Sequence, residues 1–112
     1  ALPICIMEQD RLELHAMLQT TLPGIPLYFR PSSTLVMTYP CIVYDVEELT
    51  SAHANNIFYA GGTRFKVTYI CPLPGDDNPS ILLRNIPGAK HTSSFLSDDL
   101  VHDVFRIFIN VI

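Results

Sequence analysis

Two stretches in which apolar residues recur at every second position constrain this chain more than any other feature. In the first, over 64–71, the alternating apolar residues are Phe65, Val67, Tyr69 and Cys71. In the second, over 101–111, they are Val101, Phe105, Ile107, Ile109 and Val111, interrupted only by Asp103. A period of two is that of a strand with one buried face. The sequence therefore predicts two strands that place one side of a sheet against a core.

Four further strands are predicted, over 26–30, 35–44, 57–59 and 90–95. Pro40 has no N–H to give a neighbouring strand, so it marks an edge, a bulge or a strand start. The run Ala60-Gly61-Gly62-Thr63 is predicted to be a hairpin turn, because paired glycines tolerate the positive φ angles of tight turns. The polar and acidic stretch 45–56 is predicted to be a loop.

Two helices complete the predicted elements. Residues 7–20 place Met7, Leu14 and Leu18 on one stripe, and Pro23-Gly24 ends this helix. A short helix over 80–85 follows Asn78 as N-cap and Pro79 as first residue. The order of elements predicts an α+β fold: a mainly antiparallel sheet of about five or six strands, packed by one longer and one short helix.

The composition describes one domain with unusually few charges. The 112 residues are 48% hydrophobic and only 16% charged, with net charge −4, against about 25% charged in an average soluble domain. This excludes a disordered chain and a strongly basic nucleic-acid module. No repeat or linker divides residues 1–112. The apolar start lacks the basic flank of a signal peptide, so we expect a soluble intracellular product, without a membrane segment, whose three cysteines are reduced and buried.

No motif predicts catalysis, a cofactor or a metal site. The four histidines are isolated in the sequence, without metal-ligand spacing. A small hydrolase or ligand-binding domain would use His102 as a base with Asp98 or Asp99, but a turn that closes a hairpin explains these residues more simply. Asp103 would point to the opposite face of the strand from His102. We therefore predict a protein that is not an enzyme.

Three segments, in order, resemble a family of small virion proteins of tailed bacteriophages. The first is Tyr28-Phe29-Arg30-Pro31 followed by Met37-Thr38-Tyr39-Pro40-Cys41-Ile42-Val43-Tyr44. The second is Ala54-Asn55-Asn56, then Tyr59, then Phe65-Lys66-Val67-Thr68-Tyr69-Ile70. The third is Asp98-Asp99-Leu100-Val101-His102-Asp103-Val104-Phe105, in which Asp99 and Val101 stand where the family often has asparagine. The chain is similar to the tail-terminator, or tail-completion, proteins.

The resemblance implies a structural role in the virion, at the tail or neck, after assembly in the host cytoplasm. Such proteins form a homo-oligomeric ring, commonly hexameric, that caps the head-proximal end of the tail tube. Its partners would be the tail tube protein and the head–tail connector, and DNA would pass through without specific binding. A head-side connector or stopper ring is the alternative of the same class.

The resemblance also implies which residues serve the ring. Expected structural or subunit-interface residues are Tyr39, Pro40, Tyr44, Asn56, Asp99, His102 and Asp103. Asp76 and Asp77 are expected in an acidic loop that faces the lumen. The few charges and many aromatic residues suit a surface that is buried between subunits.

Overall fold

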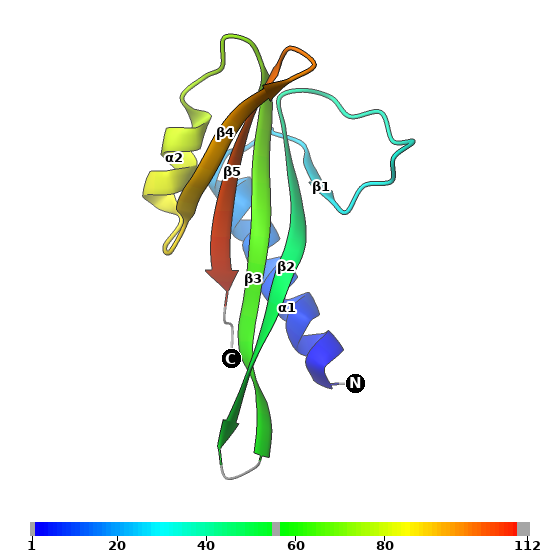
Figure 1. Cartoon of the computed structure of the whole chain (residues 1–112), viewed down its shortest axis with the longest axis vertical. Coiled ribbons are helices and arrows are strands. Elements are labelled where there is room, and N and C mark those ends of the chain that lie inside the picture. The colour runs from blue at the N-terminus through cyan, green and yellow to red at the C-terminus, as the bar shows by residue number, and fades with distance from the viewer. Residues whose placement is uncertain (1, 55–56, 110–112) are drawn as a thin grey trace.

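The computed structural model describes the backbone of residues 2–54 and 57–109, and the side chains of residues 9–48 and 62–109. The elements are α1 (Leu2–Thr21), β1 (Leu27–Phe29), β2 (Cys41–Ala54), β3 (Ile57–Pro72), α2 (Asn78–Asn85), β4 (Lys90–Ser97) and β5 (Leu100–Ile109). The strands form one sheet in the order β1-β2-β3-β5-β4, antiparallel except where β1 runs parallel to β2. Both helices lie on the same face of this sheet (Figure 1). The predicted α+β fold is confirmed, with five strands and two helices.

The core fills the space between the helices and the sheet, as the alternation predicts. Phe65, Val67 and Tyr69 of β3 are fully buried, next to Phe105 and Ile107 of β5. From the other side they meet Leu14 and Leu18 of α1 and Leu82 of α2. Each such side chain contributes about 1.5–3 kcal/mol by leaving water. The core therefore fixes which face of the sheet the helices cover.

The helices begin slightly differently from the prediction. α1 begins at Leu2 rather than residue 7, with Pro3 in its first turn, where the missing N–H costs nothing. Its end is as predicted, with Gly24 at a φ of 84°. The N-cap of α2 is Asp77, not Asn78, although its side chain makes no capping hydrogen bond. Asp76 instead accepts the Asn78 N–H at 2.9 Å.

The strand predicted over 35–44 is wrong in its first half. Residues 30–40 form a connection, and β2 begins at Cys41, directly after Pro40. Because β1 runs parallel to β2, the chain must return to the same end of the sheet before β2 begins. Residues 35–40 of this connection have the composition of a strand, but no described strand lies beside them, and Val36 is 90% exposed. Pro40 is therefore at a strand start, one of its three predicted positions.

The loop predicted over 45–56 and the turn predicted over 60–63 are both wrong. β2 continues to Ala54, which pairs with Ile57 at the start of β3, so residues 45–54 belong to a strand; residues 55–56 lie outside the described residues. The acidic residues of 45–48 lie in β2 and pair with arginines. The two glycines lie within β3, where pairing skips Gly61 between Ala60 and Gly62. Gly62 has a φ of 126°, so the glycines accommodate a bulge instead of a turn.

The distal part of the β2–β3 hairpin extends beyond the rest of the sheet. The described part of β5, which ends at Ile109, pairs with β3 as far as Thr63, whereas β2 and β3 pair with each other down to Ala54 and Ile57. We call residues 49–54 and 57–62 the arm; Figure 1 shows it projecting at one end of the molecule. Within the described residues, no third strand pairs with the arm.

Candidate functional site

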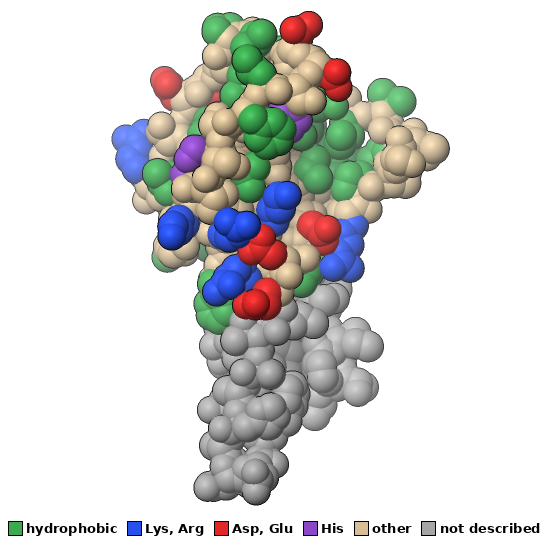
Figure 2. Space-filling view, in the orientation of Figure 1, with side chains coloured by type: hydrophobic (Ala, Val, Ile, Leu, Met, Phe, Trp, Pro, Cys, Tyr) green, Lys and Arg blue, Asp and Glu red, His purple; other side chains and the backbone are tan. Residues whose placement is uncertain are grey.

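The sheet face without helices is divided into a charged half and an apolar half (Figure 2). Alternation places the even-numbered residues of β3 and β5 on this face, and we call it the open face. Its charged half lies next to the arm and its apolar half lies toward the other end of the molecule. Five of the seven basic residues lie in or beside the charged half: Arg30, Arg64, Lys66, Lys90 and Arg106.

The charged half is a network of ion pairs between strands. Asp45, Lys66, Arg106 and Lys90 stand directly opposite one another across four strands. Arg106 Nε donates to both carboxylate oxygens of Glu47, at 2.7 and 2.8 Å. This hydrogen bond lowers the pKa of Glu47, and the charges of Arg64 and Lys66 act in the same direction. Three carboxylates thus offset five cations that lie far apart in the sequence.

Two further pairs extend the network on the β2 side of the sheet. Arg30 Nε donates to Asp45 Oδ1, and Arg64 donates to Glu48 at 3.0 Å. These side chains are about half exposed, and such surface pairs each contribute about 0.2–1 kcal/mol. They therefore orient side chains more than they stabilise the fold.

His102 belongs to the apolar half of the open face. Its ring stacks on Phe95 of β4, with centroids 4.8 Å apart and an angle of 8° between the planes. Its Nδ1 lies 3.2 Å from the carbonyl oxygen of Leu100. Among the described residues it bonds to neither Asp98 nor Asp99. His102 thus joins β4 to β5, in agreement with the simpler of its two interpretations.

Asp98 and Asp99 form the two-residue turn between β4 and β5. Their φ angles are 54° and 62°. Positive φ at both turn residues is typical of two-residue hairpin turns, because it matches the right-handed twist of the two strands. Aspartate tolerates positive φ better than most residues, because its short side chain hydrogen-bonds locally. The carbonyl oxygen of Asp99 lies 3.4 Å from the N–H of Leu73, so this turn adjoins the loop after β3. The predicted aspartate-rich turn is confirmed.

Asp103 points to the helix-covered side of the sheet, opposite to His102, as predicted. It bonds to His91 Nε2 at 3.1 Å across the β4–β5 pair, and its side chain is 14% exposed. Both residues line a groove of about 280 Å³ between α2 and β4, together with Pro79, Ser80, Leu83 and Phe105. Sequence reasoning missed this pair, although both residues belong to adjacent antiparallel strands. No hydrogen bond links Ser80 to His91 among those described.

Tyr69 anchors the acidic loop that follows β3. Its buried hydroxyl donates to Asp76 at 2.7 Å and accepts from the Asn78 side-chain amide at 2.8 Å. Burial raises the pKa of Tyr69; Asp76 adds to this rise, and the hydrogen bond from Asn78 opposes it. Asp76 is thus a structural residue that holds the loop against the sheet. Asp77 is exposed.

The remaining predicted site residues lie in different environments. Tyr44 is buried in the core, where its hydroxyl lies 2.8 Å from His15 Nδ1 and its ring packs on Phe29. Of the two expected roles, structural or subunit-interface, Tyr44 has the structural one. Tyr39 is 37% exposed and precedes the half-buried Pro40. Asn56 lies outside the described residues.

A buried carboxylate that sequence reasoning did not single out joins α1 to β3. Asp10 is fully buried and accepts a hydrogen bond from Thr63 Oγ1 at 2.7 Å. Thr63 pairs with Ile109, the last described residue of β5. This contact therefore fixes the helix at the place where the arm leaves the sheet.

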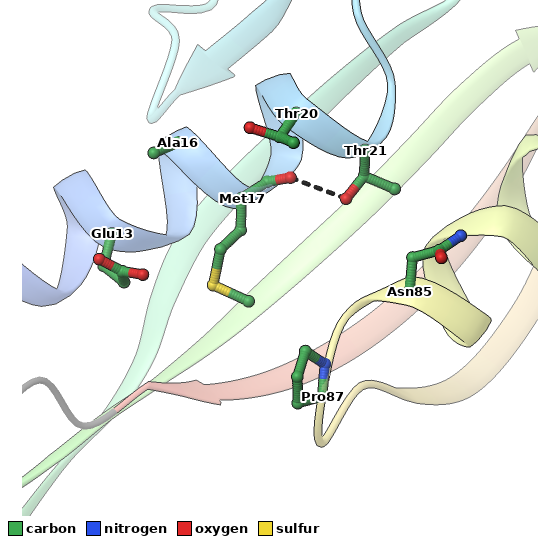
Figure 3. Close-up of a pocket in the computed structure, with 7 residues that line it drawn as sticks. All are labelled: Glu13, Ala16, Met17, Thr20, Thr21, Asn85 and Pro87. Carbon is green, nitrogen blue, oxygen red and sulfur yellow. Dashed lines mark hydrogen bonds between the residues drawn. The ribbon is translucent and has the colours of Figure 1, made fainter.

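A second pocket, of about 340 Å³, opens between α1 and the end of α2 (Figure 3). Glu13, Thr20, Thr21 and Asn85 supply its polar groups. Two of these are already bonded within their own helices, Thr21 to Met17 and Asn85 to Ile81, each at 2.8 Å. Of the seven residues that line this pocket, Glu13 is the only one with an ionisable side chain.

Cys41 and Cys71 are buried free thiols, as predicted for two of the three cysteines; the Cys5 side chain is not described. Burial raises the pKa of Cys41 to about 11 and also raises that of Cys71, so both stay protonated at neutral pH. No three of the described His, Cys, Asp and Glu side chains are placed to hold a metal ion. No helix in the described part of the chain is long and apolar enough to cross a membrane.

Comparison with known proteins gives no assignment. No protein-family model matches the sequence, and a search of curated proteins finds no match.

Tyr69→Phe is predicted to lower stability by about 1–2 kcal/mol at pH 8, because it leaves Asp76 and Asn78 without their shared partner. The folded state raises the pKa of Tyr69, so the tyrosine stabilises below its unfolded value of about 10 and loses that contribution as pH rises above it. Urea unfolding at pH 8 and pH 10.5 measures both effects.

The difference between wild type and Tyr69→Phe should therefore shrink at pH 10.5. Tyr39→Phe removes the same hydroxyl from an exposed ring and should change stability by less than about 0.5 kcal/mol at pH 8. A Tyr69→Phe deficit that is the same at both pH values would contradict the account of the buried hydroxyl.

Proposed function

We propose that this protein is a non-enzymatic virion subunit that forms a ring at the head-proximal end of a phage tail. The ring ends tail-tube growth and joins the tail to the head connector. The proposal rests on the three ordered segments that resemble tail-terminator proteins. One structural observation supports it: a sheet with helices on one face only, whose two edges remain open.

The open surfaces suit assembly better than a free-standing monomer. β4 forms one edge of the sheet, no described strand pairs with its outer side, and Phe95 and Leu96 on it are 49% and 63% exposed. On the other edge, β1 covers β2 only at Ile42–Tyr44. Unpaired edges and exposed apolar side chains promote aggregation of a monomer, and the same features form contacts in an interface. Two different edges on one subunit allow head-to-tail contacts, which can close into a ring.

The catalytic alternative has less support. His102 is engaged with Phe95 and Leu100, and the histidine that does meet a carboxylate, His91, has no hydrogen-bonded nucleophile among the described residues. A histidine oriented by a carboxylate needs such a nucleophile to begin covalent catalysis. The His91–Asp103 pair is accounted for by its contact between β4 and β5.

The acidic end of the molecule supports the proposed lumen-facing loop. Asp76 and Asp77 lie in the loop after β3, next to the turn formed by Asp98 and Asp99. Figure 2 shows acidic side chains at this end, opposite the charged half of the open face. A lumen lined by carboxylates repels the DNA backbone, so DNA passes without binding.

The central test is assembly on tail tubes. We expect the purified protein, alone or with tail tubes, to form a ring; a hexamer has six times the 12.6 kDa subunit mass. Electron microscopy of labelled virions should locate it at the head-proximal end of the tail. A stable monomer that never joins tubes or virions would contradict the proposal, and label on the head side of the neck would favour the connector ring.

Charge reversal at Asp77 tests the lumen. Asp77 makes no side-chain capping bond, so Asp77→Lys is expected to leave the fold intact. If this loop faces the lumen, rings of the variant should retain DNA in gel-shift assays at least about tenfold better at low salt. Glu13→Lys makes the same reversal on α1 and should leave DNA retention unchanged. Equal retention by wild type and Asp77→Lys would place the loop outside the lumen.

A further inference from the structure

The charged half of the open face aligns three cations across three neighbouring strands. Lys66 of β3 and Lys90 of β4 both stand directly opposite Arg106, on the strand between them. Adjacent strands lie about 4.8 Å apart, and like charges that stand directly opposite one another destabilise a sheet. We call these three residues the cationic row. An anion placed over the row would relieve the repulsion along it.

The subunit's own carboxylates compensate only the middle of the cationic row. Glu47 is the extra residue of a bulge in β2, and both its oxygens accept from Arg106. Lys66 and Lys90 are exposed, and neither forms a hydrogen bond or an ion pair among the described residues, although the charge of Lys66 acts on Glu47. These two are the only lysines of the chain. Their amines are therefore open to an anion from outside the subunit.

The turn between β4 and β5 carries the complementary charge on the same chain. The carboxylates of Asp98 and Asp99 are exposed, and neither forms a hydrogen bond or an ion pair among the described residues. The turn lies at the end of the molecule opposite to the arm (Figure 1). Two exposed carboxylates at a two-residue tip thus match two exposed amines on the open face, in number and in charge.

One subunit cannot join its own turn to its own lysines. Lys90 is eight residues before Asp98 along β4. Arg106, which is level with both lysines, is seven residues after Asp99 along β5. At about 3.3 Å per residue of strand, the turn is more than about 20 Å away from the cationic row. The carboxylates of the turn can therefore reach only the lysines of a second copy.

The charge of the whole chain favours a second copy over nucleic acid as the anion. The net charge is −4, although the charged half of the open face has more cations than carboxylates. The rest of the chain is therefore acidic and repels a phosphate backbone. A duplex would bring phosphates beside these acidic surfaces along its length, whereas a two-residue tip brings its carboxylates to the cationic row alone.

We propose that the Asp98–Asp99 turn of one copy binds the cationic row on the open face of the next copy. This inference rests on the proposed ring and assigns two of its contact surfaces, in addition to the open edges. The contact joins two different surfaces, so each copy offers its turn to one neighbour and its row to the other, as a head-to-tail ring requires. The adjoining loop with Asp77 lies outside this contact and remains the proposed lining of the lumen.

Carbodiimide cross-linking tests the contact directly, because it joins an amine to a carboxylate only where the two touch. Assembled wild-type protein should give peptides that link Lys66 or Lys90 to Asp98 or Asp99. Mixing unlabelled and isotope-labelled chains shows by mass spectrometry that each link joins two copies. The matched control, Lys66→Arg with Lys90→Arg, keeps both charges and removes both amines, so it should assemble without these links.

A double-mutant cycle separates this contact from a general effect of charge. Lys66→Gln with Lys90→Gln should raise the concentration for half-assembly at least about tenfold, while the free subunit becomes no less stable to urea, because like charges are removed. Asp98→Asn with Asp99→Asn should weaken assembly equally, since asparagine keeps the positive φ of the turn. All four substitutions together should weaken assembly little further than either pair alone.

Two single variants remove one charge of each sign outside the contact. Asp77→Asn neutralises a carboxylate in the loop beside the turn, and Arg84→Gln neutralises a cation on α2. Both should leave the concentration for half-assembly unchanged. A loss of assembly in either variant, as large as that of the lysine or aspartate pair, would contradict a contact limited to the turn and the cationic row.

The outcomes separate this inference from the proposed function. Rings that give none of these links, or in which the two pairs of substitutions act additively or not at all, would overturn the contact and leave the ring. Links from the lysines to a tail-tube or connector protein in place of a second copy, or duplex DNA bound by the row, would also overturn it. Linked copies that never join tail tubes or virions would overturn the proposed function alone, and a chain that stays monomeric would overturn both.

Discussion

The packing of β3 against α1 determines which face of each neighbouring strand is buried. β3 is the central strand, and its odd-numbered side chains from Phe65 to Tyr69 are fully buried against the helices. Because β2 and β5 pair with it on either side, their own faces follow from its register. The buried hydrogen bond between Asp10 and Thr63 joins α1 to β3 beside Ile109, the last described residue of β5. In the part of the chain that the structure describes, two helices cover one face only, so the other face and both edges remain available for contacts.

The parts of the fold that follow from local pattern were predictable from the sequence. The alternation over 64–71 and 101–109, the stripe of Leu14 and Leu18, and the Asp98–Asp99 turn all appear in the structure. The β2–β3 hairpin was not predictable in the same way. Its charged residues at 45–48 resemble a loop in composition, but they lie in a strand because β2 pairs with β3, and their side chains meet arginines of β3 and β5. The glycines at 61–62 indicate a turn locally, but the long-range pairing of β2 makes them a bulge.

The same distinction applies to the candidate functional residues. His102 and Asp103 were expected to be structural or subunit-interface residues, and each contacts β4, from opposite faces of β5. The charged half of the open face could not be found from spacing along the chain. Lys66, Arg106 and Lys90 become neighbours only through the register of three strands. The few charged residues of the chain are therefore unevenly distributed. They gather on one half of the open face and at the acidic end, and the arm has none.

Hydrogen–deuterium exchange in free and assembled subunits measures most directly whether the open edges are contact surfaces. Exposed edge amides exchange at low cost, whereas amides paired across an interface are protected. Assembly is predicted to slow exchange in β4 and in the β2 strand of the arm, and to leave the already paired amides at the centre of β3 unchanged. Equal exchange of both edges in free and assembled protein would contradict the account.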